Sequence, residues 1–177
     1  MKILAYSGST SSTSINQQLA RYAASLFEGA EVELADLNDF EMPLFSVDRE
    51  REIGQHPLAQ KFLEMISAAD VIVLSVPEHN GLYPAAFKNH FDWMSRIRKD
   101  VFQDKPMLLM ATSPGGRGGK SVLEFAEVHL PRYAANIKAV FSLPSFKDNF
   151  DTKTQMISNP EFDAKLREAV LSTQGHI

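Results

Sequence analysis

The chain has 177 residues, no cysteine and a formal charge of −4, with 44% hydrophobic and 23% charged residues. These values are typical of one globular domain with a substantial core, and we expect a single domain over residues 1–177. The charge argues against a nucleic-acid partner, and the lack of cysteine excludes disulfides, thiol nucleophiles and cysteine-ligated metal sites.

The sequence also bears on membranes and location. No apolar run approaches the ~20 residues that span a bilayer. Residues 1–8 enter an apolar strand directly and show no signal-peptide pattern. We therefore expect a cytoplasmic protein with no membrane span.

Apolar, β-branched-rich segments alternate with helical patterns along the chain. The expected strands are Lys2–Ser7, Val32–Leu37, Val71–Val76, Met107–Thr112 and a weaker Ile137–Leu143. Apolar residues spaced by three and four predict a helix after each strand, over 15–26, 58–69, 87–94, 122–133 and 162–170. This alternation predicts an α/β fold: a flavodoxin-like three-layer sandwich around a five-stranded parallel sheet of order 2-1-3-4-5.

Two connections are longer than the about 12–15 residues that compact domains tolerate without a function. Asn38–Pro57 follows the second strand and Pro144–Pro160 follows the fifth. The first is a candidate cover for a ligand. Its charged run, Asp48–Glu52, favours a solvated segment instead.

The turn after the first strand is rich in hydroxyl groups: six of the nine residues in Gly8–Asn16 are serine or threonine. Ser14, with Gln17 three residues later, predicts a capping box at the start of the first helix. Free N–H groups and the helix dipole favour a phosphate there. The turn matches neither GxGxxG nor GxxxxGKS, which leaves a phosphate site of another kind, or a polar turn with an ordinary cap.

Two further turns lie at carboxyl strand ends, where open α/β sheets bind their ligands. Pro77–Tyr83 follows the third strand and contains a carboxylate, an imidazole, an amide and a glycine. Ser113–Gly119 follows the fourth strand, and its four glycines let the backbone approach a flat ligand closely. Together the three turns predict a site for a phosphate, a linking chain and a planar ring. A mononucleotide such as FMN suits this site better than a peptide or a metal ion.

These turns resemble those of the NADPH-dependent FMN reductases, a family that includes chromate and quinone reductases and related azoreductases. The matching segments are GSTSSTSIN at 8–16, PEHNGLYPAAFKNHFDW at 77–93 and SPGGRGG at 113–119. The resemblance implies non-covalent FMN and NADPH or NADH as co-substrate. It also implies a homodimer or homotetramer that transfers two electrons to quinones, flavins, azo dyes or metal oxyanions.

By this resemblance, the first turn holds the phosphate of FMN, and the other two contact its ribityl chain and ring. The implied residues are Ser9, Ser11, Ser14, Ile15 and Asn16, then Pro77, Glu78, His79, Asn80 and Gly81, then Ser113, Gly115, Gly116 and Arg117. Arg117 has three open roles: stabilising the reduced ring, meeting the nucleotide phosphates of the co-substrate, or lying in solvent. Because the cofactor carries the chemistry, we expect no catalytic residue and no metal.

The sequence departs from the family at two positions. Family members commonly carry an arginine in the first turn, whereas Thr10–Thr13 are all hydroxylic, so one charge-assisted phosphate contact is missing. His79 stands where tyrosine is usual, and a histidine, unlike a tyrosine, can gain a positive charge in mild acid. The two departures bear on the affinity for FMN and on its pH dependence.

Several side chains in or near these turns have structural interpretations. We expect Phe87, Phe91 and Trp93 in the core or a subunit interface rather than against the ring. His90 and His129 are expected to be structural or exposed. Glu78 suits a turn-capping role as well as a contact with a ring N–H.

Two other functions remain open at the level of sequence. A flavodoxin, which is an electron carrier, also has a hydroxyl-rich phosphate loop without arginine. The chain lacks the strongly acidic face that such carriers usually show. A flavin-free binding module on the same scaffold is the second alternative. A titration with FMN and nicotinamide nucleotides separates all three.

Overall fold

The computed structural model describes residues 1–175; the last two residues of the expected domain, 176–177, lie outside the described residues. Five parallel strands form the middle layer in the order β2-β1-β3-β4-β5, which confirms the predicted flavodoxin-like order. The strands are β1 (Lys2–Ser7), β2 (Glu31–Ala35), β3 (Val71–Ser75), β4 (Pro106–Thr112) and β5 (Asn136–Leu143).

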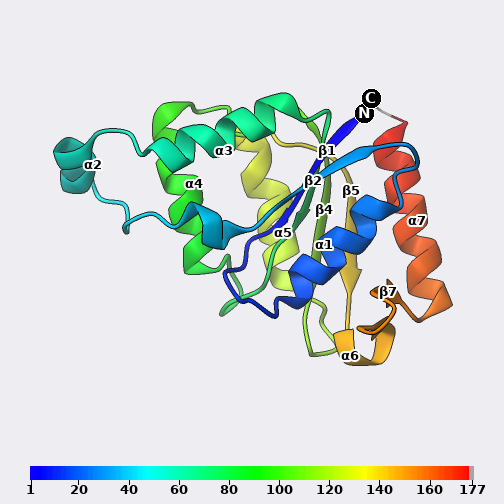
Figure 1. The fold of residues 1–177 in the computed structure, drawn as a ribbon. Coiled ribbons are helices and arrows are strands. Elements are labelled where there is room, and N and C mark those ends of the chain that lie inside the picture. The colour runs from blue at the N-terminus through cyan, green and yellow to red at the C-terminus, as the bar shows by residue number, and fades with distance from the viewer. Residues whose placement is uncertain (176–177) are drawn as a thin grey trace.

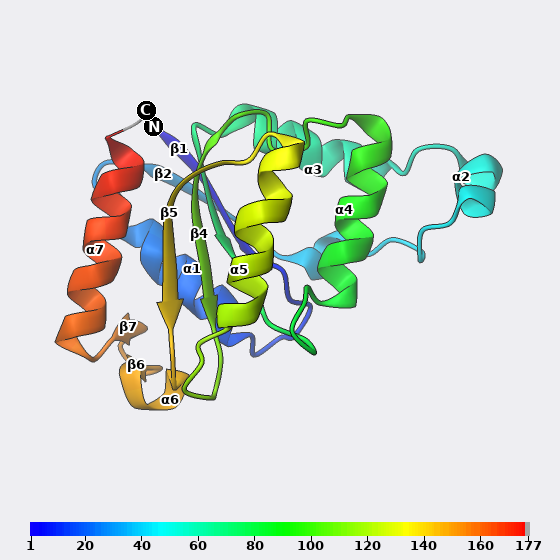
Figure 2. The ribbon, with the colours of Figure 1, turned by 180° about the vertical axis from the view of Figure 1, so that it is seen from behind.

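Helices cover both faces of this sheet, as the alternating pattern predicts. One face carries α1 (Ile15–Ser25) and α7 (Pro160–Gln174), and the other carries α3 (Pro57–Ala68), α4 (Ala85–Ile97) and α5 (Lys120–His129) (Figures 1 and 2). A separate apolar core fills the space on each face.

The central strands read as unbroken apolar runs because both of their faces are covered. Every residue of β3 is buried. Ile72 and Leu74 point into the core beneath α3 and α4, whereas Val71 and Val73 point into the core beneath α1 and α7. The aromatic residues of α4 belong to the core beneath α3 and α4. Trp93 therefore packs inside the protein and does not offer a surface for stacking on a ring.

Two predicted boundaries are wrong for local reasons. The helix expected over 122–133 ends at His129 and continues as a 3-10 turn, η2 (Leu130–Tyr133), because Pro131 lacks the N–H that an α-helix needs there. The second strand ends at Ala35 rather than Leu37. The carboxylate of Asp36 accepts the N–H of Asn38 at 2.9 Å and starts a 3-10 helix instead.

The two long connections contain short elements that the sequence pattern did not predict. The first carries η1 (Leu37–Phe40) and α2 (Val47–Ile53), and the second carries α6 (Phe146–Asn149), β6 (Phe150–Asp151) and β7 (Met156–Ile157). Helix α2 buries none of its residues and projects from the body on an arm (Figures 1 and 2). The charged run is therefore solvated, as its composition indicates.

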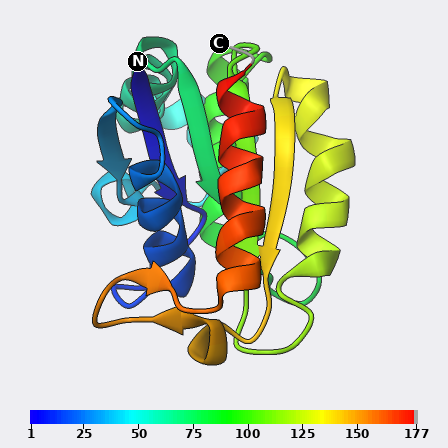
Figure 3. The same cartoon turned by 90° about the vertical axis from the view of Figure 1, so that its right-hand side faces the viewer.

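The carboxyl ends of the parallel strands lie at one edge of the sheet. Figure 3 shows that α6 and the β6–β7 hairpin also lie at this edge, beside the N-terminal end of α1. No helix among residues 1–175 is long and apolar enough to cross a bilayer.

Candidate functional site

The three turns singled out from the sequence lie side by side at the carboxyl edge of the sheet. The N–H of Gly8 donates to the carbonyl of Ser75 at 3.0 Å, and the N–H of Val76 donates to that of Met110 at 2.8 Å. These bonds join the end of β1 to β3 and the end of β3 to β4. A Cβ added at Gly8 would lie 3.1 Å from the Cβ of Phe87, so the first turn also packs directly on α4.

Ser14 caps α1, and only half of the predicted capping box forms. The Ser14 hydroxyl accepts the N–H of Gln17 at 3.1 Å, as predicted. The Gln17 side chain does not return to Ser14. Its Oε1 accepts the N–H of Ser7 at 2.9 Å, and its Nε2 donates to the carbonyl of Ala35 at 3.0 Å. The Gln17 side-chain amide therefore bonds backbone groups at the ends of β1 and β2 in place of the N–H of Ser14.

Asn16 is buried, and its side chain is hydrogen-bonded to the ends of two strands of the sheet. Its Oδ1 accepts the Ser75 hydroxyl at 2.7 Å and the N–H of Thr112 at 3.0 Å, while Nδ2 donates to the carbonyl of Thr112 at 3.1 Å. The side-chain oxygen of Asn16 already accepts two hydrogen bonds, whereas its backbone N–H has no acceptor within residues 1–175 and can be offered to a ligand. The sequence carried a sign of this role, because Asn16 falls on the same helical face as the buried Leu19, Ala20 and Ala23.

The first turn presents hydrogen-bond donors that suit an anion. The N–H groups of Ser12, Ile15 and Asn16 have no acceptor within residues 1–175. The hydroxyl oxygen of Ser9 accepts the N–H of Ser11, which leaves the Ser9 proton free to donate outward, and the hydroxyls of Ser11 and Thr13 share one hydrogen bond at 3.4 Å. These donors stand at the positive end of the α1 dipole, so the geometry fits a phosphate.

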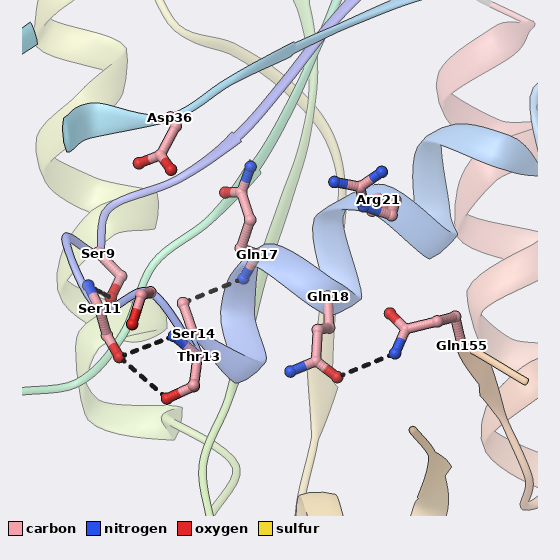
Figure 4. A pocket seen from close by; sticks show the side chains of 10 residues that line it. Ser9, Ser11, Thr13, Ser14, Gln17, Gln18, Arg21, Asp36 and Gln155 are labelled. Carbon is pink, nitrogen blue, oxygen red and sulfur yellow. Dashed lines mark hydrogen bonds between the residues drawn. The ribbon is translucent and has the colours of Figure 1, made fainter. Parts of the chain in front are cut away.

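A hollow of about 390 Å³ opens beside this turn (Figure 4). Hydroxyl groups of the first turn form one wall, and polar side chains of α1 and Gln155 form another. Asp36 and Arg21 are the charged groups among the lining residues. The lining residues are Ser9, Ser11, Ser12, Thr13, Ser14, Gln17, Gln18, Arg21, Asp36 and Gln155.

The turn after β3 is a tight reversal that presents His79 to solvent. His79 and Leu82 exchange backbone hydrogen bonds at 3.0 and 3.1 Å, and Asn80 and Gly81 between them have φ of 54° and 83°. Positive φ at both central positions explains the Asn-Gly pair. Pro77 is buried at the base of the turn, whereas His79 and Asn80 are exposed.

Glu78 has the capping role. Its Oε2 accepts the N–H groups of Ser121 and Val122, at 3.0 and 3.2 Å, at the start of α5. A carboxylate there satisfies two of the free N–H groups of the helix and complements its dipole. The carboxylate of Glu78 therefore joins the turn after β3 to the helix after β4.

The glycine-rich turn after β4 divides into two parts. Gly115 and Gly116 are exposed, and a Cβ at either would meet nothing within 4 Å, so this backbone is open to a ligand. Gly118 and Gly119 serve packing instead: a Cβ at Gly118 would lie 2.9 Å from Pro144 N, and one at Gly119 would lie 2.7 Å from Ala111 Cβ. The expectation that all four glycines serve a flat ligand is therefore wrong for this second pair.

The two polar side chains of this turn, those of Ser113 and Arg117, form hydrogen bonds with nearby residues. The Ser113 hydroxyl donates to the carbonyl of Gly115 at 3.0 Å. The Arg117 side chain is exposed, and its Nη2 donates to the Ser121 hydroxyl at 2.9 Å. Arg117 thus lies at the solvent boundary beside the open backbone of Gly116.

Asn89 has a structural role that its local sequence did not indicate. Its amide accepts the N–H of Phe45 at 2.8 Å and donates to the carbonyls of Met42 and Pro43, at 3.1 and 3.2 Å. Trp93 Nε1 donates to the same Pro43 carbonyl at 2.8 Å. Two side chains of α4 therefore fix the base of the arm that carries α2.

His90 and His129 have hydrogen-bond partners within the fold, in line with the structural role expected for them. Nε2 of the buried His90 lies 2.9 Å from the Phe40 carbonyl and donates to it, and burial lowers the pKa of His90 to about 4. Nδ1 of His129 lies 3.3 Å from the hydroxyl of Tyr83, and burial also lowers the pKa of His129. Among residues 1–175, no group of three or more histidine or acidic side chains is placed to hold a metal ion.

The donor set of this edge fits FMN. Free N–H and hydroxyl groups of the first turn suit its phosphate, and the open backbone at Gly115 and Gly116 leaves room for a planar ring. A model of the family described as NADPH-dependent FMN reductase matches residues 1–148. The chain belongs to this family.

Individual FMN reductases and their relatives agree with this assignment. The chain is 30% identical to an NADPH:quinone oxidoreductase of Arabidopsis thaliana, over 98% of this chain and 90% of that protein. It is also 30% identical to an NAD(P)H-dependent FMN reductase of Pseudomonas aeruginosa, over 96% and 89% of the two chains. A flavoenzyme NAD(P)H:(acceptor) oxidoreductase from Paracoccus denitrificans shares the fold, with a TM-score of 0.76 at 20% identity over 99% and 98% of the chains.

Membership of this family makes the protein an FMN-dependent NAD(P)H oxidoreductase. The enzyme interpretation of the sequence is thus confirmed, and the flavodoxin-type carrier and the flavin-free module are not favoured.

Proposed function

We propose that this FMN reductase binds FMN across the three turns and passes two electrons from NADPH or NADH to a quinone, flavin, azo dye or metal oxyanion. The supporting observation is the proximity of two complementary surfaces. Free N–H and hydroxyl donors lie on the first turn, and exposed glycine backbone lies on the turn after β4. The turn after β3 lies between them.

Each proposed contact uses the atoms that the fold leaves available. Asn16 contributes its N–H, since its amide is held by β3 and β4, and Glu78 contributes its backbone, since its carboxylate caps α5. The proposed contacts are Ser9, Ser11, Ser14, Ile15 and Asn16 for the phosphate, Pro77, Glu78, His79, Asn80 and Gly81 for the ribityl chain or ring, and Ser113, Gly115, Gly116 and Arg117 for the other edge of the ring.

When bound, FMN supplies the hydride and electron transfer, so the chain needs no acid or base of its own. The chain orients the ring and stabilises charge on it. The N–H groups of Gly115 and Gly116 have no acceptor within residues 1–175 and can donate to a reduced, negatively charged ring. Because Asn80, Gly116 and Arg117 are exposed, the edge is open and suits acceptors of several shapes.

An absorbance titration tests this function. The purified protein should be yellow or should bind added FMN, and NADPH or NADH should bleach the flavin band within one turnover. An added quinone should then restore the band. A flavin that accumulates as a one-electron species and ignores both nicotinamide nucleotides would support the carrier instead. A colourless protein without affinity for FMN would contradict the proposal outright.

We also propose a homodimer or homotetramer. Phe125 and Val128 are exposed by 40% and 65% on one face of α5, and the arm exposes Leu44 by 79%. Light scattering should give the mass of two or four chains. Val128→Asp should reduce this mass, whereas Leu171→Asp, at a comparably exposed site on α7, should not. A monomeric wild-type protein would overturn the proposal.

Two further proposals concern the whole chain. The lack of cysteine fits a reducing compartment and supports a cytoplasmic location, which fractionation of the native host cell would test. The two cores share one sheet, which supports a single domain over 1–177. A single cooperative unfolding transition is the expected result.

A further inference from the structure

The first turn has no cation of its own, although it presents an anion-type donor set. Residues 8–14 are glycine, serine and threonine only. A phosphate monoester carries up to two negative charges, and hydroxyl and N–H donors alone leave this charge uncompensated. A nearby cation from elsewhere in the fold would therefore improve the site.

Arg21 is the one cation among the residues that line the hollow beside this turn. It lies on α1, four residues after Gln17 and seven after Ser14. These spacings place the three side chains on one face of the helix. Helical side chains lean toward the N-terminus of their helix, which here is the end that carries the free N–H groups. Figure 4 shows Arg21 about one turn along α1 from Gln17, among the residues that line the hollow.

The Arg21 guanidinium is also available to bind a ligand. It forms no ion pair and no side-chain hydrogen bond within residues 1–175. The acidic residue of the hollow, Asp36, uses Oδ1 to accept the N–H and the side-chain amide of Asn38, at 2.9 and 2.8 Å. An exposed, unpaired arginine can reorient at little energetic expense, because no native contact has to break.

We infer that Arg21 supplies the positive charge that the first turn lacks and so gives the protein its preference for FMN over riboflavin. This inference rests on the proposed binding of FMN at the three turns. It assigns to the second turn of α1 a role that no residue of the phosphate turn can fill. Because the guanidinium has several donors, it adds both charge and hydrogen bonds to the N–H and hydroxyl set.

The test compares two flavins that differ only in the phosphate. Dissociation constants for FMN and riboflavin are measured by fluorescence quenching at low salt, where charge interactions are least screened. The variants are Arg21→Gln, which removes the charge, and Arg21→Lys, which keeps it. Arg132→Gln removes an exposed arginine on η2, away from the site, and is the matched control.

Arg21→Gln should weaken FMN binding about tenfold, or ~1.4 kcal/mol, and leave riboflavin binding unchanged. Arg21→Lys should retain most of the affinity for FMN, and Arg132→Gln should match the wild type for both ligands. Raising the salt concentration should reduce the difference in FMN affinity between the wild type and Arg21→Gln.

Several results would overturn the inference. If Arg21→Gln binds FMN as the wild type does, or loses both flavins equally, Arg21 does not act on the phosphate. If the wild type binds both flavins with one affinity, the phosphate is not recognised at all, although the flavin site stands. A wild type that binds neither flavin overturns the proposed function itself, and with it this role of Arg21.

Discussion

Asn16 and Thr112 are joined by two hydrogen bonds, one in each direction, although 96 residues separate them in the chain. The same Asn16 oxygen accepts the hydroxyl of Ser75. One buried amide therefore holds the N-terminus of α1 against the ends of both β3 and β4. The three turns of the site keep their relative positions partly through this side chain.

Replacing Asn16 with alanine should destabilise the protein by about 2–4 kcal/mol, because it removes three hydrogen bonds and leaves buried partners unsatisfied. Urea unfolding measures the loss. Asn38→Ala, which removes an exposed amide bonded only to Asp36, should alter the stability by less than about 1 kcal/mol. If Asn16→Ala lowers the unfolding free energy by no more than Asn38→Ala does, the hydrogen bonds from Asn16 to the ends of β3 and β4 contribute little to stability.

Glu78 offers a way to separate capping from flavin binding. Glu78→Ala should lower the stability by about 1 kcal/mol, because the first N–H groups of α5 lose their acceptor. Glu78→Gln keeps an acceptor and should lose less. FMN affinity should be nearly unchanged in Glu78→Gln. An affinity that falls sharply in this variant while stability holds would instead show a direct contact between the carboxylate and the flavin.

His90 should make the protein less stable in mild acid. Burial against Phe40 and Phe62, with His56 nearby, lowers its folded-state pKa to about 4, below the value of about 6.5 for an unfolded chain. The unfolded state therefore binds the proton first. The folded protein should lose about 2 kcal/mol between pH 7 and pH 5 from this group alone.

The measurement for His90 is the difference between two unfolding curves. Urea unfolding of the wild type and of His90→Gln at pH 7 and pH 5 cancels the contributions of the carboxylates, which titrate in both proteins. The stability of the variant should depend less on pH. Equal pH dependence in the two proteins would mean that His90 is protonated as readily in the folded state as in the unfolded one.

The glycine-rich turn allows a matched pair of substitutions. Gly118→Ala places a Cβ against Pro144 and the Ser142 hydroxyl at a φ of +59°, so it should destabilise the protein by at least about 2 kcal/mol. Gly116→Ala meets open space and should leave thermal stability within about 0.5 kcal/mol. If the ring packs on Gly116, this second variant should still bind FMN more weakly. Unchanged FMN affinity in Gly116→Ala would show that the ring does not pack on Gly116.

Local patterns in the sequence predicted the strands, most of the helices and the three turns. Each depends on residues that are neighbours in the chain. The run Val71–Val76 is apolar because a central parallel strand is covered on both faces. Asn80 and Gly81 occur together because the turn needs positive φ at both positions. Burial of a strand and the φ angles of a tight turn depend on a few consecutive residues, so they can be recognised from the local sequence.

The interactions that complete the site join residues far apart in the chain, and only the tertiary structure decided them. Nothing near Gln17 indicates that Ala35 will take its amide, and nothing near Asn89 indicates that it will hold the arm. The sequence by itself determined the family and the sheet, and it predicted the edge of the sheet at which the cofactor binds. The structure decided which polar groups at that edge already have hydrogen-bond partners and which, like Arg21, have none within residues 1–175. Hydrogen bonding between distant groups depends on their positions in space, which the order of residues along the chain does not display.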